Sequence, residues 1–149
     1  MKTKALIFLS YARDDQDMVK SVYKRLQAEG YSPWMDQFDI LPGENWERSI
    51  RAAIQKADFF LIFLSNHSVN RRGVLQQEIR MALDSWNKML SDDIYLIPVR
   101  LSDCPIPGDL APFQWVDFFV DTGWDKLISA IKAGLKKRRN DPRNKKSSY

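Results

Sequence analysis

The sequence predicts an α/β fold in which a five-stranded parallel sheet is covered by helices on both faces. Short apolar runs alternate along the chain with segments whose apolar residues recur at helical spacing. Parallel strands need long crossover connections, usually helices, so this alternation favours a parallel sheet. The chain has 149 residues, of which 44% are hydrophobic, and this suits one domain with a substantial core.

Five segments are expected to form the strands. The unbroken apolar run at residues 59–64 is expected at the centre of the sheet, where both of its faces are buried. Pro33 removes an amide donor from the second strand, which is therefore expected at or near a sheet edge. The expected strands span residues 5–9, 31–35, 59–64, 94–101 and 113–119.

Four apolar stripes at helical spacing lie between and after these strands. The first ends at Gly30, a favoured residue at a helix C-terminus, and the second begins at Trp46. The third and fourth stripes span residues 75–90 and 124–135. Ligands of parallel α/β sheets bind beyond the carboxyl ends of the strands, where the strand order reverses. We therefore expect the site among the loops at residues 10–15, 36–45 and 65–73.

Composition excludes several classes of protein. The sequence contains no apolar run near the roughly 20 residues that span a bilayer. A single cysteine, Cys104, excludes an internal disulfide and a multi-cysteine metal site, and a single histidine, His67, excludes most zinc and Ser/His/Asp sites. We therefore expect a cytoplasmic protein without a bound metal. His67 itself is interpreted as an exposed loop residue or as a ligand contact.

The positive charge is concentrated at the C-terminal end. Residues 132–149 contain eight Lys or Arg and one Asp, whereas the rest of the chain has 15 basic and 18 acidic residues. Nucleic-acid binding is thus not expected of the domain itself. We expect a domain at residues 1–135 and a basic tail or linker at residues 136–149. A tail that binds nucleic acid or acidic lipid remains the alternative.

Two familiar site types are excluded by their motifs. The sequence has neither the GxGxxG nor the GxxxxGK[ST] pattern of phosphate-binding loops. A response-regulator receiver is excluded because it needs an aspartate at the end of the third strand, where Ser65 and Asn66 follow Leu64 here.

Several segments together resemble a TIR domain (Toll, interleukin receptor and resistance protein) of the bacterial type. They are FLSY at 8–11, WMD at 34–36, ILPG at 40–43, ADFFLIFLS at 57–65 and RRGVLQQEI at 71–79. The resemblance covers about residues 3–135 in the family's order and spacing. It implies a flavodoxin-like fold and, as in many members, cleavage of NAD at the nicotinamide–ribose bond.

The resemblance places the family's catalytic glutamate at Glu78. One carboxylate suits this chemistry, because nicotinamide leaves as a neutral pyridine while positive charge develops on the ribose. NAD is then the substrate and no cofactor is implied. The alternative is that Glu78 is a solvated glutamate on a helix. The product is expected to be ADP-ribose or a cyclised form, in a bacterial defence or stress pathway.

The resemblance also indicates substrate-binding residues. Trp46 matches an aromatic that stacks on a ligand ring, with a core position as its alternative. Asp36 matches a polar residue of the pocket, with turn capping as its alternative. Ser10, Tyr11 and Arg13 lie on the first loop, where Arg13 is either the contact to the pyrophosphate of NAD or a solvated side chain.

One position departs from the family's pattern. Active relatives often carry an aromatic residue four positions before the glutamate, and Val74 stands there in this chain. Loss of a stacking face weakens binding by about 1–3 kcal/mol, by analogy with bases stacked on aromatic side chains. Val74 therefore favours the alternative function, a non-catalytic TIR module that signals by self-association.

The resemblance implies head-to-tail association with other TIR domains, which gates activity by completing the pocket. Heterologous contacts of this kind build open filaments. A sensor domain or a partner chain that supplies one is a further expected partner. The predicted assembly loop consists of Asp39, Ile40, Leu41, Pro42, Gly43, Glu44 and Asn45.

Overall fold

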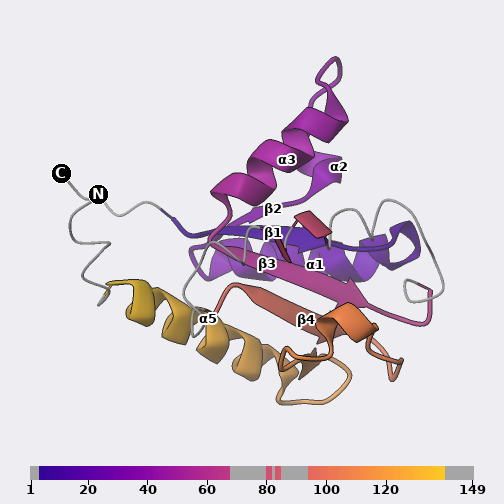
Figure 1. Cartoon of the computed structure of the whole chain (residues 1–149), viewed down its shortest axis with the longest axis vertical. Helices are drawn as coiled ribbons and strands as arrows, with labels where there is room; N and C mark the ends of the chain where they lie inside the picture. The colour runs from indigo at the N-terminus through magenta and orange to yellow at the C-terminus, as the bar shows by residue number, and fades with distance from the viewer. Residues whose placement is uncertain (1–3, 68–79, 82, 85–93, 140–149) are drawn as a thin grey trace.

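The computed structural model describes residues 4–67, 80–81, 83–84 and 94–139. These residues form a five-stranded, all-parallel sheet with helices on both faces, as the sequence predicts (Figure 1). The strands are β1 (Leu6–Ser10), β2 (Ser32–Trp34), β3 (Phe59–Leu64), β4 (Leu96–Arg100) and β5 (Val116–Asp117). The helices are η1 (Arg13–Asp15), α1 (Gln16–Ala28), α2 (Asp36–Asp39), α3 (Trp46–Lys56), η2 (Gly108–Leu110) and α5 (Gly123–Arg139).

The strand order is β2-β1-β3-β4-β5, which is the flavodoxin-like order. The central position of β3 and the edge position of β2, which contains Pro33, are both confirmed. In register, Ser10 of β1 lies beside Ile62 of β3, and Leu64 of β3 lies beside Arg100 of β4. The strand order reverses between β1 and β3, so a crevice is expected at their carboxyl ends.

Two hydrophobic cores lie on the two faces of the sheet, because successive side chains of a strand point to opposite faces. One core joins Leu9 and Leu61 to Val22 of α1 and Leu127 of α5. The other joins alternate residues of the same strands, such as Phe8, to α3. Figure 1 shows α3 and α5 on opposite sides of the sheet.

Three boundaries differ from the expectation. The predicted strand at residues 113–119 is reduced to Val116–Asp117. The predicted loop at 36–45 begins with the short helix α2, which has too few residues to show an apolar period. Helix α5 continues to Arg139, four residues beyond the apolar stripe that predicts it. The third predicted helix, at residues 75–90, falls mostly outside the described residues, although Arg80, Met81, Leu83 and Asp84 are helical.

Candidate functional site at the strand ends

Polar side chains from the first two strand ends meet directly. Tyr11, which follows β1, donates a hydrogen bond from its hydroxyl to Oδ1 of Asp36, at 2.5 Å. The same Oδ1 atom accepts the backbone N–H of Gln37 at 2.9 Å, at the start of α2. The Asp36 carboxylate therefore stabilises the start of α2 and contacts Tyr11, and its role in a ligand pocket stays a prediction.

The other predicted binding residues differ in accessibility. Ser10 is buried at the end of β1, whereas Arg13 is exposed at the start of η1. Trp46 is the first residue of α3, as predicted, and 51% of its surface is exposed. The core position considered for Trp46 is therefore wrong: its indole is available at the surface. The buried residues of that helix are Ile50, Ala53 and Ile54.

The predicted assembly loop contains both structural and exposed residues. Asp39 Oδ2 accepts the Met35 N–H at 2.8 Å and the Tyr23 hydroxyl at 3.4 Å. Burial and the nearby Asp39 carboxylate raise the pKa of Tyr23. Asn45 caps α3 by accepting the Arg48 N–H at 3.0 Å. Asp39 and Asn45 thus fix the two ends of the loop.

Between these ends, the loop turns and projects apolar surface. Glu44 Oε1 accepts the Leu41 N–H at 2.7 Å, and Gly43 has a φ of +91°, a conformation that favours glycine. Pro42 is exposed and Ile40 half-buried, while Leu41 is 64% exposed. Figure 1 shows this loop at the outer tip of the molecule, between α2 and α3.

Two buried polar residues at the strand ends were not singled out from the sequence. Ser65, directly after β3, donates a hydrogen bond from Oγ to Asp15 Oδ2 at 2.6 Å. The side chain of His67 is 61% exposed, and its Nδ1 lies 3.7 Å from Asp14 Oδ2. This agrees with the interpretation of His67 as an exposed loop residue. Ser65 directly follows the most apolar strand, and this position is the feature of the sequence from which a buried polar contact could be predicted.

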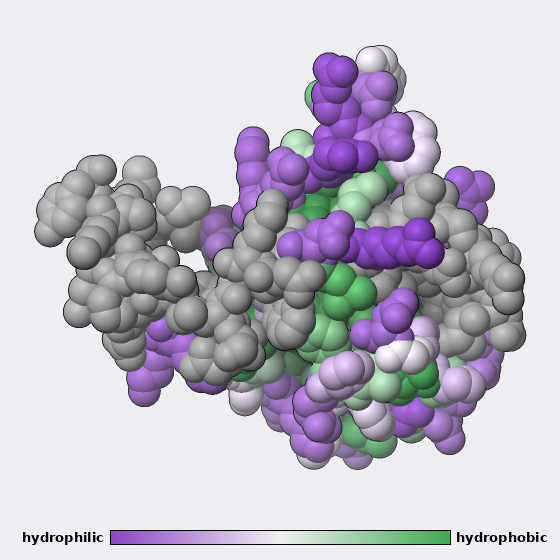
Figure 2. Space-filling model, viewed as in Figure 1, coloured by the Kyte–Doolittle hydropathy of each residue, from purple (hydrophilic) through white to green (hydrophobic). Residues whose placement is uncertain are grey.

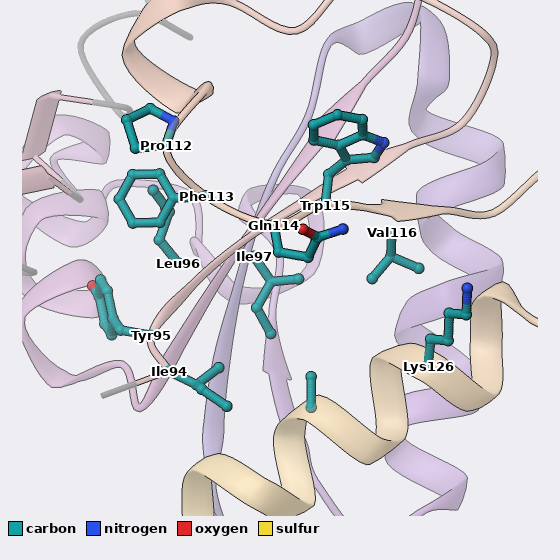
Figure 3. Close-up of a pocket in the computed structure, with 11 residues that line it drawn as sticks. Ile94, Tyr95, Leu96, Ile97, Pro112, Phe113, Gln114, Trp115, Val116 and Lys126 are labelled. Carbon is teal, nitrogen blue, oxygen red and sulfur yellow. The ribbon is translucent and has the colours of Figure 1, made fainter. Parts of the chain in front are cut away.

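At the opposite edge of the sheet, a cavity of about 690 Å³ lies between β4 and α5. Figure 3 shows that its lining side chains come from β4, from the segment leading into β5, and from α5. The lining includes Tyr95, Ile97, Trp115, Val116 and Ala130. Trp115 in this lining is 36% exposed, and Phe119, which follows β5 in the chain, is 47% exposed.

The thiol of Cys104 is unsuited to nucleophilic chemistry. Cys104 is buried, and this burial raises the pKa of its thiol. Within the part of the chain that the structure describes, no cluster of His, Cys, Asp and Glu could hold a metal ion. Over the same residues, no helix is both long and apolar enough to span a membrane.

Glu78 and Val74, the predicted catalytic residue and the departure from the family pattern, lie outside the described residues. Of the predicted binding residues that the structure describes, Tyr11 and Asp36 contact each other, and Arg13 lies on the same loop as Tyr11. Tyrosine, arginine and aspartate can bind the hydroxyl, phosphate and cationic groups of a dinucleotide.

Comparisons with known proteins agree with this architecture. A family model described as TIR domain matches residues 7–131. The chain is 28% identical over 108 residues to the NAD(+) hydrolase PdTIR of Paracoccus denitrificans, covering 65% of this chain and 36% of that protein. It is 22% identical over 107 residues to the 2′ cyclic ADP-D-ribose synthase BtTIR of Bacteroides thetaiotaomicron, covering 64% and 37%. The chain thus spans little more than a third of each relative's length.

Among solved structures, the fold is similar to the TIR domain of the Toll-related receptor TRR-2 from Hydra magnipapillata. The TM-score is 0.70 at 17% identity, and the match covers 85% of this chain and 97% of that one. At this identity the likeness concerns the fold alone.

Proposed function

This chain belongs to the TIR domain family, and from that premise we propose that it is an NAD glycohydrolase of bacterial defence or stress signalling. It cleaves the nicotinamide–ribose bond of NAD and releases nicotinamide with ADP-ribose or a cyclic ADP-ribose. NAD is the substrate and no further cofactor is required. The observation that carries the proposal is the match to two bacterial relatives named for NAD hydrolysis and for cyclic ADP-ribose synthesis.

The bond cleavage needs one well-placed carboxylate. As the glycosidic bond breaks, its electron pair neutralises the pyridinium nitrogen of nicotinamide, and positive charge develops at the anomeric carbon of the ribose. The carboxylate of Glu78 stabilises this charge. Water then adds to that carbon and loses a proton, which gives ADP-ribose. Alternatively, a ribose hydroxyl of the same molecule adds to it and loses its proton, which gives a cyclic product.

The described residues supply groups for binding. The exposed Arg13 guanidinium suits the pyrophosphate of NAD, because arginine pairs with phosphate oxygens. The Tyr11–Asp36 pair presents a phenol and a carboxylate, which suit the ribose hydroxyls. The exposed face of Trp46 suits an aromatic ring of the ligand and favours cationic nicotinamide over the neutral product.

The first experiment compares NAD consumption by the wild type and by Glu78→Gln, with products separated by chromatography. The wild type is expected to consume NAD. The kcat of the variant should be lower by about 100-fold or more, as when one group that stabilises transition-state charge is removed. Glu29→Gln is the matched control because Glu29 is exposed at the end of α1. Intact NAD with wild-type protein at all concentrations tested contradicts the proposal.

We also propose that head-to-tail assembly gates this activity. The protruding loop with Leu41 lies next to the β2 edge of the sheet, and the cavity beside Trp115 lies at the β5 edge. Two unlike apolar surfaces at opposite edges favour a heterologous contact, in which the loop of one copy enters the cavity of the next. NAD consumption per molecule is then expected to rise steeply with protein concentration.

Val74 favours a second candidate function, a TIR module that signals through self-association without cleaving NAD. The two functions are separated by the biological effect of Glu78→Gln. An assembly module keeps its effect in that variant, whereas an NAD glycohydrolase loses it.

A further inference from the structure

A buried pair of polar residues bridges the loops that follow β1 and β3. Asp15 is 5% exposed and Ser65 is 3% exposed, and the Ser65 hydroxyl donates to Asp15 Oδ2 at 2.6 Å. Fifty residues of sequence separate them. The β1 and β3 strands are direct neighbours in the sheet, so this contact lies where the strand order reverses.

The Ser65 hydroxyl also organises its own loop. Its Oγ accepts the backbone N–H of His67 at 3.1 Å while it donates to Asp15. The hydroxyl is therefore held in one orientation by a donor on one side and an acceptor on the other. Changes at Asp15 are expected to reach the backbone of the β3 loop at His67 through this oxygen.

On the other side of the bridge, Asp15 ends the 3₁₀ turn η1, whose first residue is Arg13. The Asp15 N–H donates to Ala12 O at 2.8 Å, so both the backbone and the side chain of Asp15 are bonded. Tyr11 precedes this turn and bonds to Asp36. The bridge thus anchors the loop that carries Tyr11 and Arg13, the proposed contacts to NAD.

We propose that Asp15 and Ser65 are positioning residues, which hold the loops after β1 and β3 together so that Tyr11 and Arg13 are preorganised to bind NAD. This inference rests on the proposed function. A hydrogen bond to a buried carboxylate is stronger than one between neutral groups, and removing one partner leaves the other unsatisfied. The loops therefore lose their fixed arrangement when either residue is changed.

The kinetic test uses Ser65→Ala and Asp15→Asn at a temperature where both variants are folded. Each is expected to raise the KM for NAD about tenfold, the factor that corresponds to a loss of about 1.4 kcal/mol of binding, with a smaller change in kcat. Ser65→Thr keeps the hydroxyl and is expected to restore most of the affinity. Asp17→Asn is the charge-matched control, because Asp17 is exposed in the first turn of α1.

A double-mutant cycle separates positioning from general destabilisation. The Asp15→Asn/Ser65→Ala variant is expected to have a KM no higher than the worse single variant, because both changes remove the same contact. Additive effects on KM, or variants that lower only the melting temperature and leave KM unchanged, overturn the inference while the proposed function stands.

Amide hydrogen exchange at His67 tests the bridge without using activity. Asp15→Asn is expected to raise the exchange rate of this amide several-fold, although the substitution lies on the other loop, whereas Asp17→Asn leaves it unchanged. Unchanged exchange in Asp15→Asn overturns the inference. If the wild type leaves NAD intact, the proposed function fails, and the anchoring of the two loops is decided by this exchange measurement.

Discussion

At the scale of single residues, Arg100 ties the end of β4 to two other segments. Its guanidinium donates to both carboxylate oxygens of Asp117, at 2.7 and 3.0 Å, and to the backbone oxygen of Cys104 at 2.9 Å. The Arg100 side chain is 14% exposed and that of Asp117 is 26% exposed, so the pair is partly shielded from water. The hydrogen bond from Arg100 lowers the pKa of Asp117 below its ordinary value of 3.8.

This pair predicts a pH-dependent contribution to stability. Asp117→Asn is expected to lower the free energy of unfolding by about 1.5–3 kcal/mol at pH 7, the range for hydrogen bonds to charged groups. Because the folded-state pKa is lowered, the stabilisation is complete above the pKa of the unfolded state, near 4, and is lost as the pH falls through the folded-state pKa.

Urea unfolding of the wild type and Asp117→Asn across pH 7 to 3 checks this expectation. The stability difference should be constant above about pH 5 and should shrink below about pH 4, where the wild-type carboxylate becomes protonated. Asp109→Asn, at an exposed site in η2, should show no such convergence. A difference that stays constant down to pH 3 contradicts the expected role of the ion pair.

The sequence could predict the loops of the candidate site but only some of its residues. Trp46 and Asp36 match a family pattern, and their places in the fold follow from the alternation of strands and helices, while their roles in binding stay predictions. Asp15 and Ser65 were missed because their contact depends on two loops fifty residues apart meeting above neighbouring strands. Residue type alone does not distinguish a buried aspartate from the exposed Asp14 beside it.

At the scale of elements, the packing of α5 on the sheet depends on a glycine. Gly134 approaches β3 so closely that an added Cβ would lie 2.7 Å from Cε1 of Phe59 and 3.3 Å from Cβ of Ile94. Phe59 is fully buried, so its ring has little freedom to move away. Glycine is otherwise unfavourable inside a helix by about 1 kcal/mol relative to alanine. The close approach accounts for its presence in α5.

Gly134→Ala is therefore expected to destabilise the protein despite its gain in helix propensity. Overpacking a core costs about 1–3 kcal/mol, which offsets the gain and leaves a net loss on the order of 1 kcal/mol. The melting temperature should fall by about 2–4 °C for each kcal/mol lost in a domain of this size. Gly108→Ala is the control, because an added Cβ there has no neighbour within 4 Å. A higher melting temperature for Gly134→Ala would contradict this expectation and would show that the Phe59 ring can move away from the added methyl group.

The elements with a long apolar period were predicted well, and the short ones were not. Val22 and Leu26 of α1 and Ile50 and Ile54 of α3 occupy the core-facing stripes expected from their spacing. Helix α2 has four residues, none of them buried, so it leaves no periodic pattern in the sequence. The apolar residues from Phe113 to Phe119 suggested a longer strand, but only Val116 of that segment is buried.

At the scale of the whole molecule, polar and apolar surface are unevenly distributed. Figure 2 shows hydrophilic residues over α3 and along the lower rim, with hydrophobic surface gathered between them. Apart from Met18 on α1, the exposed large apolar residues in the described part of the chain fall into two groups near opposite edges of the sheet. Phe38, Leu41 and Trp46 belong to the region after β2, and Trp115, Phe119 and Val120 adjoin β5. A contact between unlike edges leaves one free surface at each end of every assembly.

Two variants that each damage one edge distinguish this arrangement from a symmetric dimer. Leu41→Ser removes an apolar side chain that is 64% exposed, and Ala130→Phe fills the cavity between β4 and α5. Each variant alone is expected to remain monomeric and to consume NAD slowly. An equimolar mixture should form a pair, because the intact loop of Ala130→Phe can enter the intact cavity of Leu41→Ser. A mixed pair contains one loop–cavity contact for two molecules, whereas a long wild-type assembly contains about one contact per molecule. Activity per molecule should therefore recover to at most about half of the value for the assembled wild type.

Light scattering and NAD consumption of the two variants, measured separately and mixed, decide between the arrangements. Met18→Ser is the control for loss of exposed apolar surface, because Met18 is 52% exposed on α1, outside both edge groups. In an isologous dimer the same patch of both copies forms the interface. A copy with a damaged patch therefore cannot be rescued by a second copy that is intact at that patch. Mixing would then restore neither mass nor activity. Recovery on mixing thus requires that the loop and the cavity belong to one heterologous contact.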